Sequence, residues 1–174
     1  MRRRRRRAVR AAGGDDEPVS TSEQVRGVDR VRDAVTGVPP ADSVPRGVAR
    51  VGLGLGLVLA GIGHLTFARE EFQAQVPSWF PVDTDLTVLA SGAVEIALGT
   101  ALVVLPRWRV AVGLVAAAFF VVVFPGNVGQ WLEHRDGFGL DSDTKRLVRL
   151  AFQPVLVAWA LWSTGAVKAL RARR

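Results

Sequence analysis

Four long apolar blocks occupy the chain from residue 51 onward. They cover residues 51–68, 86–106, 110–132 and 150–167. A helix needs roughly 20 apolar residues to cross a hydrocarbon layer of ~30 Å, and all four blocks are close to that length. A soluble bundle would instead need a polar stripe along each helix, and the segment VAVGLVAAAFFVVVF has none. The pattern therefore predicts an all-α integral membrane four-helix bundle, with spans at about residues 48–67, 87–105, 109–130 and 147–166.

The first 46 residues have a different composition. They mix both charge signs with Gly, Pro and Ser, and they include an arginine run at 2–7. Such a segment buries too little apolar surface to offset the entropy of ordering it. We therefore expect a disordered basic arm over residues 1–46, a four-span membrane domain over 47–168 and a basic tail over 169–174. A signal peptide does not fit, because the apolar block starts far beyond the arginine run and no small-residue cleavage site follows it.

Basic residues gather on one side of the predicted spans. The chain has 23 Lys and Arg against 16 Asp and Glu, a formal net charge of +7. They dominate the arm, the link between the second and third spans, and the tail, whereas the other two links are acidic or mixed. Because Lys and Arg beside a span favour the cytoplasmic side, we expect both termini in the cytoplasm. The arginine run would then meet anionic lipid, and no nucleic acid is expected as a partner.

The amino-acid composition limits the chemistry that the chain can carry out and indicates the kind of organism that encodes it. The chain has no Cys and two His. This excludes disulfides, Fe–S clusters and thiol redox chemistry carried by the chain itself, together with a three-His zinc site, so no metal is expected. Arg is strongly preferred over Lys, and Ala, Val and Gly are abundant. That bias is typical of a GC-rich bacterial genome, which indicates a bacterial inner (plasma) membrane.

The loop between the first two spans has aromatic character. Phe72, Trp79 and Phe80 lie near two prolines in the segment EEFQAQVPSWFP. Aromatic rings settle in the headgroup layer of a membrane, and residues 69–75 could form a short amphipathic helix lying in that interface. The loop is either an interfacial anchor or a lid over a pocket.

Five polar residues within or beside the apolar blocks are the candidate site. They are His64, Glu95, Asn127, Arg149 and Gln153. With the termini inside, all five fall in the outer half of the predicted bundle. Polar groups within a membrane are costly and need an explanation. An ionised Glu95 in hydrocarbon would be strongly disfavoured, so it must pair or hold its proton, with Arg149 or His64 as its partner.

Helical spacing places two of these residues on stripes of small side chains. Gly52, Gly56, Ala60 and His64 are each four apart, and so are Ser91, Glu95 and Gly99. Small residues allow helix backbones to approach closely, so both stripes are expected to face the interior. The polar residues would then form a structural hydrogen-bonded cluster, a binding site for a small molecule or quinone head group, or a proton relay.

Five segments in order resemble the DoxX-like family of small four-helix bacterial membrane proteins. They are AGIGHLTF, VPSWFP, SGAVEIALG, FPGNV and RLAFQPVLVAWAL, spread over residues 60–161. The five candidate site residues fall where the family's recurrent polar residues occur. The family takes its name from a subunit of a thiosulfate–quinone oxidoreductase, and the resemblance therefore implies a respiratory link.

Two functions are consistent with these features. The first is a membrane module without catalytic activity of its own, which binds lipid or a partner protein or assists an envelope complex. The second is the membrane subunit of an oxidoreductase with a quinone site in the polar cluster. No catalytic residue is assigned, and a quinone is the one candidate cofactor. Without Cys, any redox chemistry would need a quinone or a partner protein.

Overall fold

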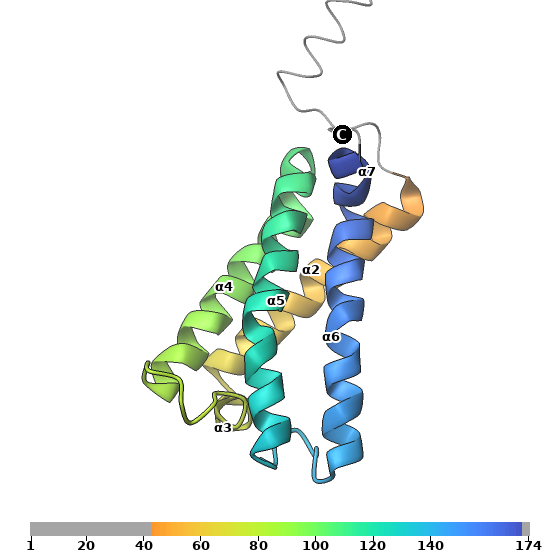
Figure 1. Cartoon of the computed structure of the whole chain (residues 1–174). Coiled ribbons are helices and arrows are strands. Elements are labelled where there is room, and N and C mark those ends of the chain that lie inside the picture. Colours follow the sequence, from red (N-terminus) through yellow and green to blue (C-terminus); the bar gives the residue numbers. More distant parts are fainter. Residues whose placement is uncertain (1–42, 172–174) are drawn as a thin grey trace, which may run out of the picture. The chain divides into compact units, whose positions relative to one another are not determined.

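The computed structural model describes residues 43–171, and every regular element in that range is a helix. The prediction of an all-α fold is confirmed. Four helices are long: α2 (Val44–Leu65), α4 (Thr84–Val104), α5 (Arg109–Leu132) and α6 (Asp143–Ser163). Three are short: α3 (Arg69–Gln73), the 3-10 turn η1 (Pro106–Trp108) and α7 (Ala166–Arg171). The four long helices are shown in Figure 1. Most of the expected disordered arm, including its contact with anionic lipid, lies outside the described residues, as do the last three residues of the tail.

The helix boundaries have local causes. Helix α2 begins at Val44, inside the segment expected to be a disordered arm, with a proline in its first turn. Proline is tolerated there because its missing N–H has no partner at a helix start. Asp83 caps α4 by accepting a hydrogen bond from the Leu86 amide at 2.9 Å. The arm prediction is therefore wrong at its end, since residues 44–46 are helical.

Three helices are long and apolar enough to cross a membrane: α2, α4, and α5 taken together with η1. Helix α6 has 21 residues and so has the length. It was predicted as the fourth span but is less apolar than the other three. The reason is its first two turns, which carry Asp143, Lys145, Arg146 and Arg149.

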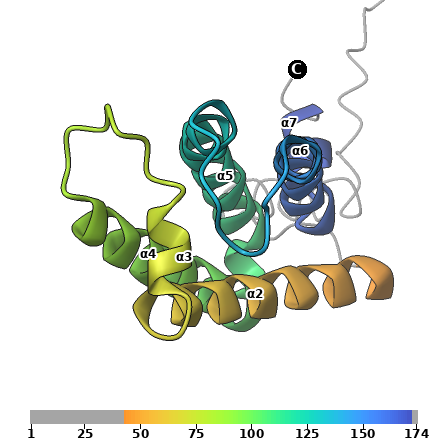
Figure 2. The same cartoon turned by 90° about the horizontal axis from the view of Figure 1, so that it is seen from below.

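The long helices pack as two close pairs. Helix α2 lies against α4 and α5 lies against α6, while α2 also meets α6 near its own start. Figure 2 shows α2 running crosswise along one side of α5 and α6, which are seen nearly end-on. Glycines allow the α2–α4 contact: a Cβ at Gly54 would lie 2.7 Å from the carbonyl oxygen of Gly99, and a Cβ at Gly61 would lie 2.6 Å from that of Gly92. The contact between α4 and α5 is much smaller.

One end of the bundle, the arginine end, carries the start of α2, the α4–α5 turn and α7 (Figure 1). Here Arg50 donates to the carbonyl of Leu102 in the last turn of α4. The indole Nε1 of Trp159 donates to the Ala49 carbonyl at 2.9 Å. These bonds tie α2 to both α4 and α6 and satisfy a carbonyl that the end of α4 leaves without a helical partner.

The opposite end, the lid end, carries α3 and the α5–α6 loop. We call residues 69–83 the lid segment. Arg69 and Asp85 form an ion pair that fixes the start of α3 to α4. The amide of Phe138 donates to the carboxylate of Glu71, which joins the α5–α6 loop to the lid segment. Both connections link segments that lie far apart in the sequence.

Candidate ligand-binding site

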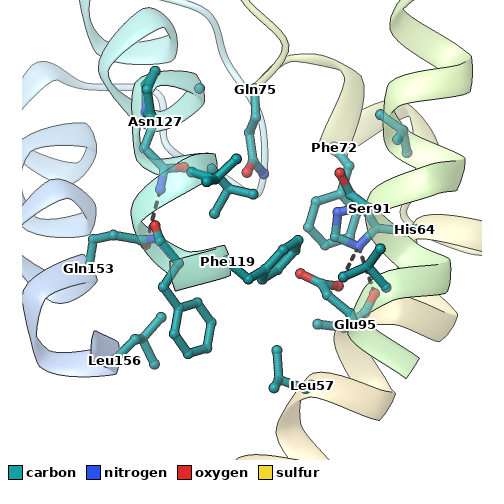
Figure 3. Close-up of a pocket in the computed structure, with 18 of the residues that line it drawn as sticks. Leu57, His64, Phe72, Gln75, Ser91, Glu95, Phe119, Asn127, Gln153 and Leu156 are labelled. Atoms are coloured by element: carbon teal, nitrogen blue, oxygen red, sulfur yellow. Dashed lines mark hydrogen bonds and ion pairs between the residues drawn. The ribbon is translucent and has the colours of Figure 1, made fainter. Parts of the chain in front are cut away.

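A cavity of about 680 Å³ lies between the four long helices and the lid segment. All five candidate residues line it: His64 from α2, Glu95 from α4, Asn127 from α5, and Arg149 and Gln153 from α6. Figure 3 shows two polar groups on opposite walls, with Phe119 between them. The volume is within the range of small-molecule sites in proteins. The structure therefore brings together residues from all four long helices around one space.

His64 and Glu95 form the first polar group. The imidazole Nδ1 lies 2.9 Å from the carbonyl oxygen of Ala60 and 3.0 Å from Oε2 of Glu95. Their side chains are 9% and 13% exposed. Phe72 from the lid segment stacks on the imidazole, with ring centroids 3.4 Å apart. Of the two alternatives, His64 and not Arg149 is therefore the residue that lies beside Glu95.

Asn127 and Gln153 form the second polar group. Asn127 Nδ2 donates to Gln153 Oε1 at 3.1 Å, and Gln153 Nε2 donates to the carbonyl of Phe120 at 2.8 Å. Both side chains are buried. Pro125 within α5 removes the helical donor to the carbonyl of the next residue, Val121, so the helical bonding of α5 is interrupted beside this contact. This group joins α5 to α6.

Arg149 contacts the lid segment, and among the described residues no ion pair joins it to Glu95. Its guanidinium donates to Gln75 Oε1 at 2.6 Å and lies over the ring of Phe138, 5.4 Å from the centroid. A guanidinium over an aromatic face is attracted by the ring quadrupole. Arg149 therefore holds the lid segment and the α5–α6 loop together above the cavity.

Two buried polar atoms at this cavity have no aligned hydrogen-bond partner among the described residues. They are Nε2 of Gln75, a donor, and Oε2 of Glu95, an acceptor. The imidazole Nδ1 of His64 can carry only one hydrogen. Its hydrogen-bond partner is the carbonyl oxygen of Ala60, so Oε2 of Glu95 lies close to the ring without a hydrogen bond to it. Buried polar groups without partners are costly. The site thus presents an open donor and an open acceptor.

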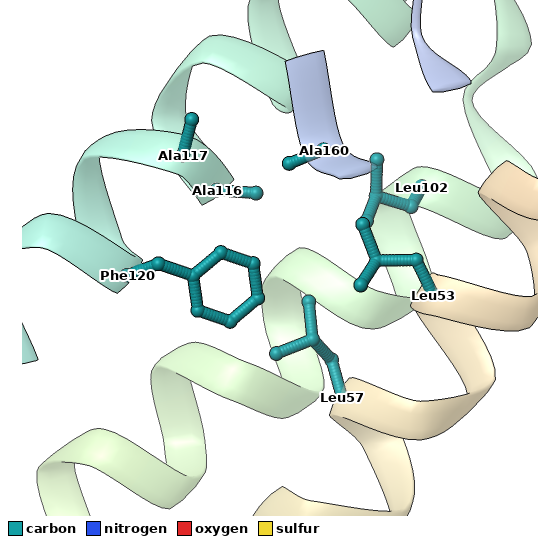
Figure 4. Close-up of a cluster of buried hydrophobic side chains, with 7 residues drawn as sticks. All are labelled: Leu53, Leu57, Leu102, Ala116, Ala117, Phe120 and Ala160. Atoms are coloured by element: carbon teal, nitrogen blue, oxygen red, sulfur yellow. The ribbon is translucent and has the colours of Figure 1, made fainter. Parts of the chain in front are cut away.

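The far end of the cavity is apolar. Leu53, Leu57 and Phe120 line it and belong to the hydrophobic core shared by the four helices. Figure 4 shows this cluster, in which Leu102 and Ala160 are fully buried. The cavity is therefore polar toward the lid end and apolar toward the arginine end.

The small-residue stripe on α2 faces this cavity. Gly52, Gly56, Ala60 and His64 all line it, and a Cβ at Gly56 would meet nothing within 4 Å. Gly52 and Gly56 are exposed at the cavity wall, and the stripe does not bring helix backbones together as expected. Gly54 and Gly61 make the close contact with α4 instead. Small residues at the stripe leave room for the cavity.

The lid segment crosses from α3 to α5 over the cavity. Phe72, Trp79 and Phe80 line the cavity, together with residues 75–77. Two glycines of α5 receive the segment: a Cβ at Gly126 would lie 2.7 Å from the carbonyl oxygen of Gln75, and one at Gly129 would lie 2.8 Å from Pro77. Of the two alternatives for this loop, its position fits a lid.

The sequence interpretation missed two residues of the site, Gln75 and Phe119. Gln75 lies in a loop beside other polar residues, and Phe119 lies in an unbroken apolar block, so neither carries a distinguishing signal. Among the described residues no group of three His, Asp or Glu side chains could hold a metal ion.

Comparison with known proteins identifies the domain but not its activity. No curated protein and no solved structure matches the chain. One family model does match, over residues 53–164, and its description is "Domain of unknown function (DUF8561)". The match covers α2 from its third turn through α6, which includes every residue of the polar cluster. The similarity to DoxX-like proteins stays a prediction. Because this match spans most of the chain, the protein belongs to the DUF8561 family.

Proposed function

We propose that the chain is a multi-pass protein of the bacterial plasma membrane, with α6 as its fourth span. The described surface supports this, since large apolar side chains are exposed on every long helix, among them Leu59 (63% exposed), Val121 (59%) and Val155 (51%), which lie outside the cavity. Exposed apolar surface on this scale suits lipid better than water. Basic residues gather at the arginine end and acidic residues at the lid end, so both termini are cytoplasmic and the lid segment is external.

The function that the site supports best is binding of an amphipathic molecule taken from the membrane. The observation that carries this proposal is the two-ended cavity, with polar side chains from four helices beside the lid and apolar side chains below. Val94 of α4 and Val122 of α5 both line the cavity and are 42% and 73% exposed. These two exposed side chains support an opening of the cavity between α4 and α5, toward the lipid. We propose a binding module without catalytic activity of its own, acting with a membrane or envelope partner.

A quinone is the second candidate ligand. Gln75 Nε2 and the Arg149 guanidinium are donors at the polar end, and carbonyl oxygens of a quinone would accept from them. The similarity to DoxX-like proteins favours the same reading, in which this chain is the membrane subunit of an oxidoreductase. A partner protein would then supply the electrons.

Filling the cavity tests the binding function. In Gly56→Leu the new side chain would enter the cavity, and in Gly47→Leu it would not, although at both positions a Cβ meets nothing within 4 Å. Native mass spectrometry and lipid extraction of protein purified from native membrane should show a bound amphiphile in the wild type and in Gly47→Leu. Gly56→Leu should fold but lose it. Equal loading of all three proteins would overturn the proposal, and extraction of a quinone would decide for the second ligand.

A further inference from the structure

We infer that the ligand is a neutral, single-chain lipid whose head group carries hydroxyl groups. This inference rests on the proposed binding function and names the class of ligand. Three properties of the cavity define that class: its volume, its formal charge, and the two polar atoms that lack partners.

The volume limits the ligand to about one chain. At the ~30 Å³ that a water molecule occupies in the liquid, about 680 Å³ holds roughly 20 non-hydrogen atoms. A small polar head and a medium-length chain fill this space. A phospholipid with two chains would have to leave most of its tails outside, between α4 and α5.

The charge favours a neutral head group. The titratable side chains that line the cavity are Glu95, Arg149 and His64. By formal charge, one acidic and one basic side chain give this set no net charge when the imidazole is uncharged. A charged head group would bring an uncompensated charge into a low-dielectric site, which is strongly disfavoured.

The two polar atoms without partners require a head group that both donates and accepts hydrogen bonds. Oε2 of Glu95 needs a donor, and Nε2 of Gln75 needs an acceptor. Both residues line the same cavity, Glu95 from α4 and Gln75 from the lid segment (Figure 3). A hydroxyl group supplies a donor and an acceptor on one atom. A head group with two adjacent hydroxyls can therefore satisfy both residues without a charge.

Three lauroyl lipids with the same chain separate these requirements. 1-Monolauroylglycerol has hydroxyls, methyl laurate only accepts, and laurate is an anion. Each is titrated into the full-length protein in phospholipid nanodiscs, and binding is measured by native mass spectrometry and by the shift in Tm. We expect 1-monolauroylglycerol to bind at least tenfold more tightly than the other two. This ratio corresponds to one well-formed hydrogen bond to a charged group.

Two variants test whether Glu95 and Gln75 cause the preference for 1-monolauroylglycerol. Glu95→Gln should weaken 1-monolauroylglycerol binding by about tenfold, because a charge-assisted hydrogen bond is replaced by a neutral one. It should leave methyl laurate unchanged. Gln75→Leu removes the donor and should weaken 1-monolauroylglycerol by a similar factor, together with methyl laurate, whose ester carbonyl can accept from the same amide. This second variant keeps the test valid if Glu95→Gln does not fold. Glu70→Gln, exposed on α3 and outside the cavity, is the matched control.

The outcomes separate this inference from the function on which it rests. Tightest binding by laurate, or equal binding of all three lipids, would overturn the hydroxyl requirement while supporting an amphiphile site. No binding of any lipid in the wild type would overturn the binding function as well.

Discussion

Gly54 and Gly99 bring the backbones of α2 and α4 into direct contact. A Cβ at Gly54 would lie 2.7 Å from the carbonyl oxygen of Gly99 and 3.2 Å from the Cβ of Leu102. A methyl group cannot be placed so close to a helical carbonyl unless the helices separate. Seven residues along α2, Gly61 meets Gly92 in the same way. The two contacts fix the crossing of α2 and α4 and thereby the height at which His64 meets Glu95.

Gly54→Ala is therefore expected to destabilise the bundle by about 1–3 kcal/mol, the usual effect of overpacking a close contact. Gly56→Ala is the control on the same helix, because its added methyl points into the cavity and meets nothing within 4 Å. It should be neutral or slightly stabilising, since Ala favours a helix over Gly by about 1 kcal/mol. Thermal unfolding in a fixed detergent measures both. Equal Tm values for the two variants would show that the α2–α4 contact is not tight.

The fold could be predicted where it depends on local apolarity. Each of the four apolar blocks overlaps one of the four long helices, and the Asp83 cap is an ordinary helix start. The pattern places the start of α2 too late because Arg46 looks like the end of the basic arm and Arg50 interrupts the apolar residues just before the first block. A helix accommodates both residues here: Arg50 bonds the Leu102 carbonyl, and Arg46 lies 5.9 Å from the Trp162 ring centroid. Contacts between segments so far apart leave no local signal.

The sequence could predict which polar residues form the site, but not which of them bond to one another. Helix length and orientation alone place five polar residues at one end of a bundle. Which of them meet depends on helix rotation and crossing, and these are set by close contacts such as that of Gly54 with Gly99. The partner of Arg149 is Gln75, a loop residue with no periodic pattern around it. Sequence reasoning had no means of choosing it.

Arg149 is expected to hold the lid segment closed. Arg149→Gln removes the bond to Gln75 and the cation above Phe138. A hydrogen bond to a charged group contributes about 1.5–3 kcal/mol, so the backbone amides of residues 75–80 should exchange with deuterium about tenfold faster or more. Hydrogen-exchange mass spectrometry of the full-length protein in nanodiscs measures this directly.

Lys145→Gln is the control for that variant. Lys145 lies one turn earlier on α6 and bonds Asp141 on the exposed surface. It should leave exchange in the lid segment unchanged. If the two variants behave alike, or if neither changes exchange at residues 75–80, Arg149 does not hold the lid segment.

A second connection to the lid segment should be lost at low pH. Burial opposes ionisation of Glu133, but hydrogen bonds from the Ser78 hydroxyl and backbone N–H, together with the Arg135 charge, outweigh it and hold its pKa below the ordinary value of 4.5. A lowered pKa in the folded state means that the contact stabilises the lid above the unfolded-state pKa. That stabilisation is lost as the pH falls through the folded-state value. The amide resonance of Ser78, followed by NMR, should therefore titrate with a midpoint below 4.5.

Glu133→Gln should abolish this titration, since an amide does not ionise and can still accept from Ser78. The resonance of Gly165, which lies between α6 and α7 at the other end of the bundle, serves as the reference. A Ser78 midpoint at or above 4.5, or one that persists in Glu133→Gln, would assign the pH dependence to another group.

We expect α6 to cross the membrane. Because the chain has no Cys, introduced single cysteines can test this crossing directly. Four single-cysteine variants report on which side of the membrane the loops and the end of α6 lie. The cysteines replace exposed residues, namely Asp83, Arg107, Asp141 and Lys168. If α6 crosses, a membrane-impermeant maleimide added to intact cells should label positions 83 and 141. Positions 107 and 168 should react only after the membrane is opened. Labelling of position 168 together with 141 would show that α6 does not cross, because its polar first turns would then keep it at the surface. The cavity would in that case open to water, and a lipid ligand would lose its route between α4 and α5.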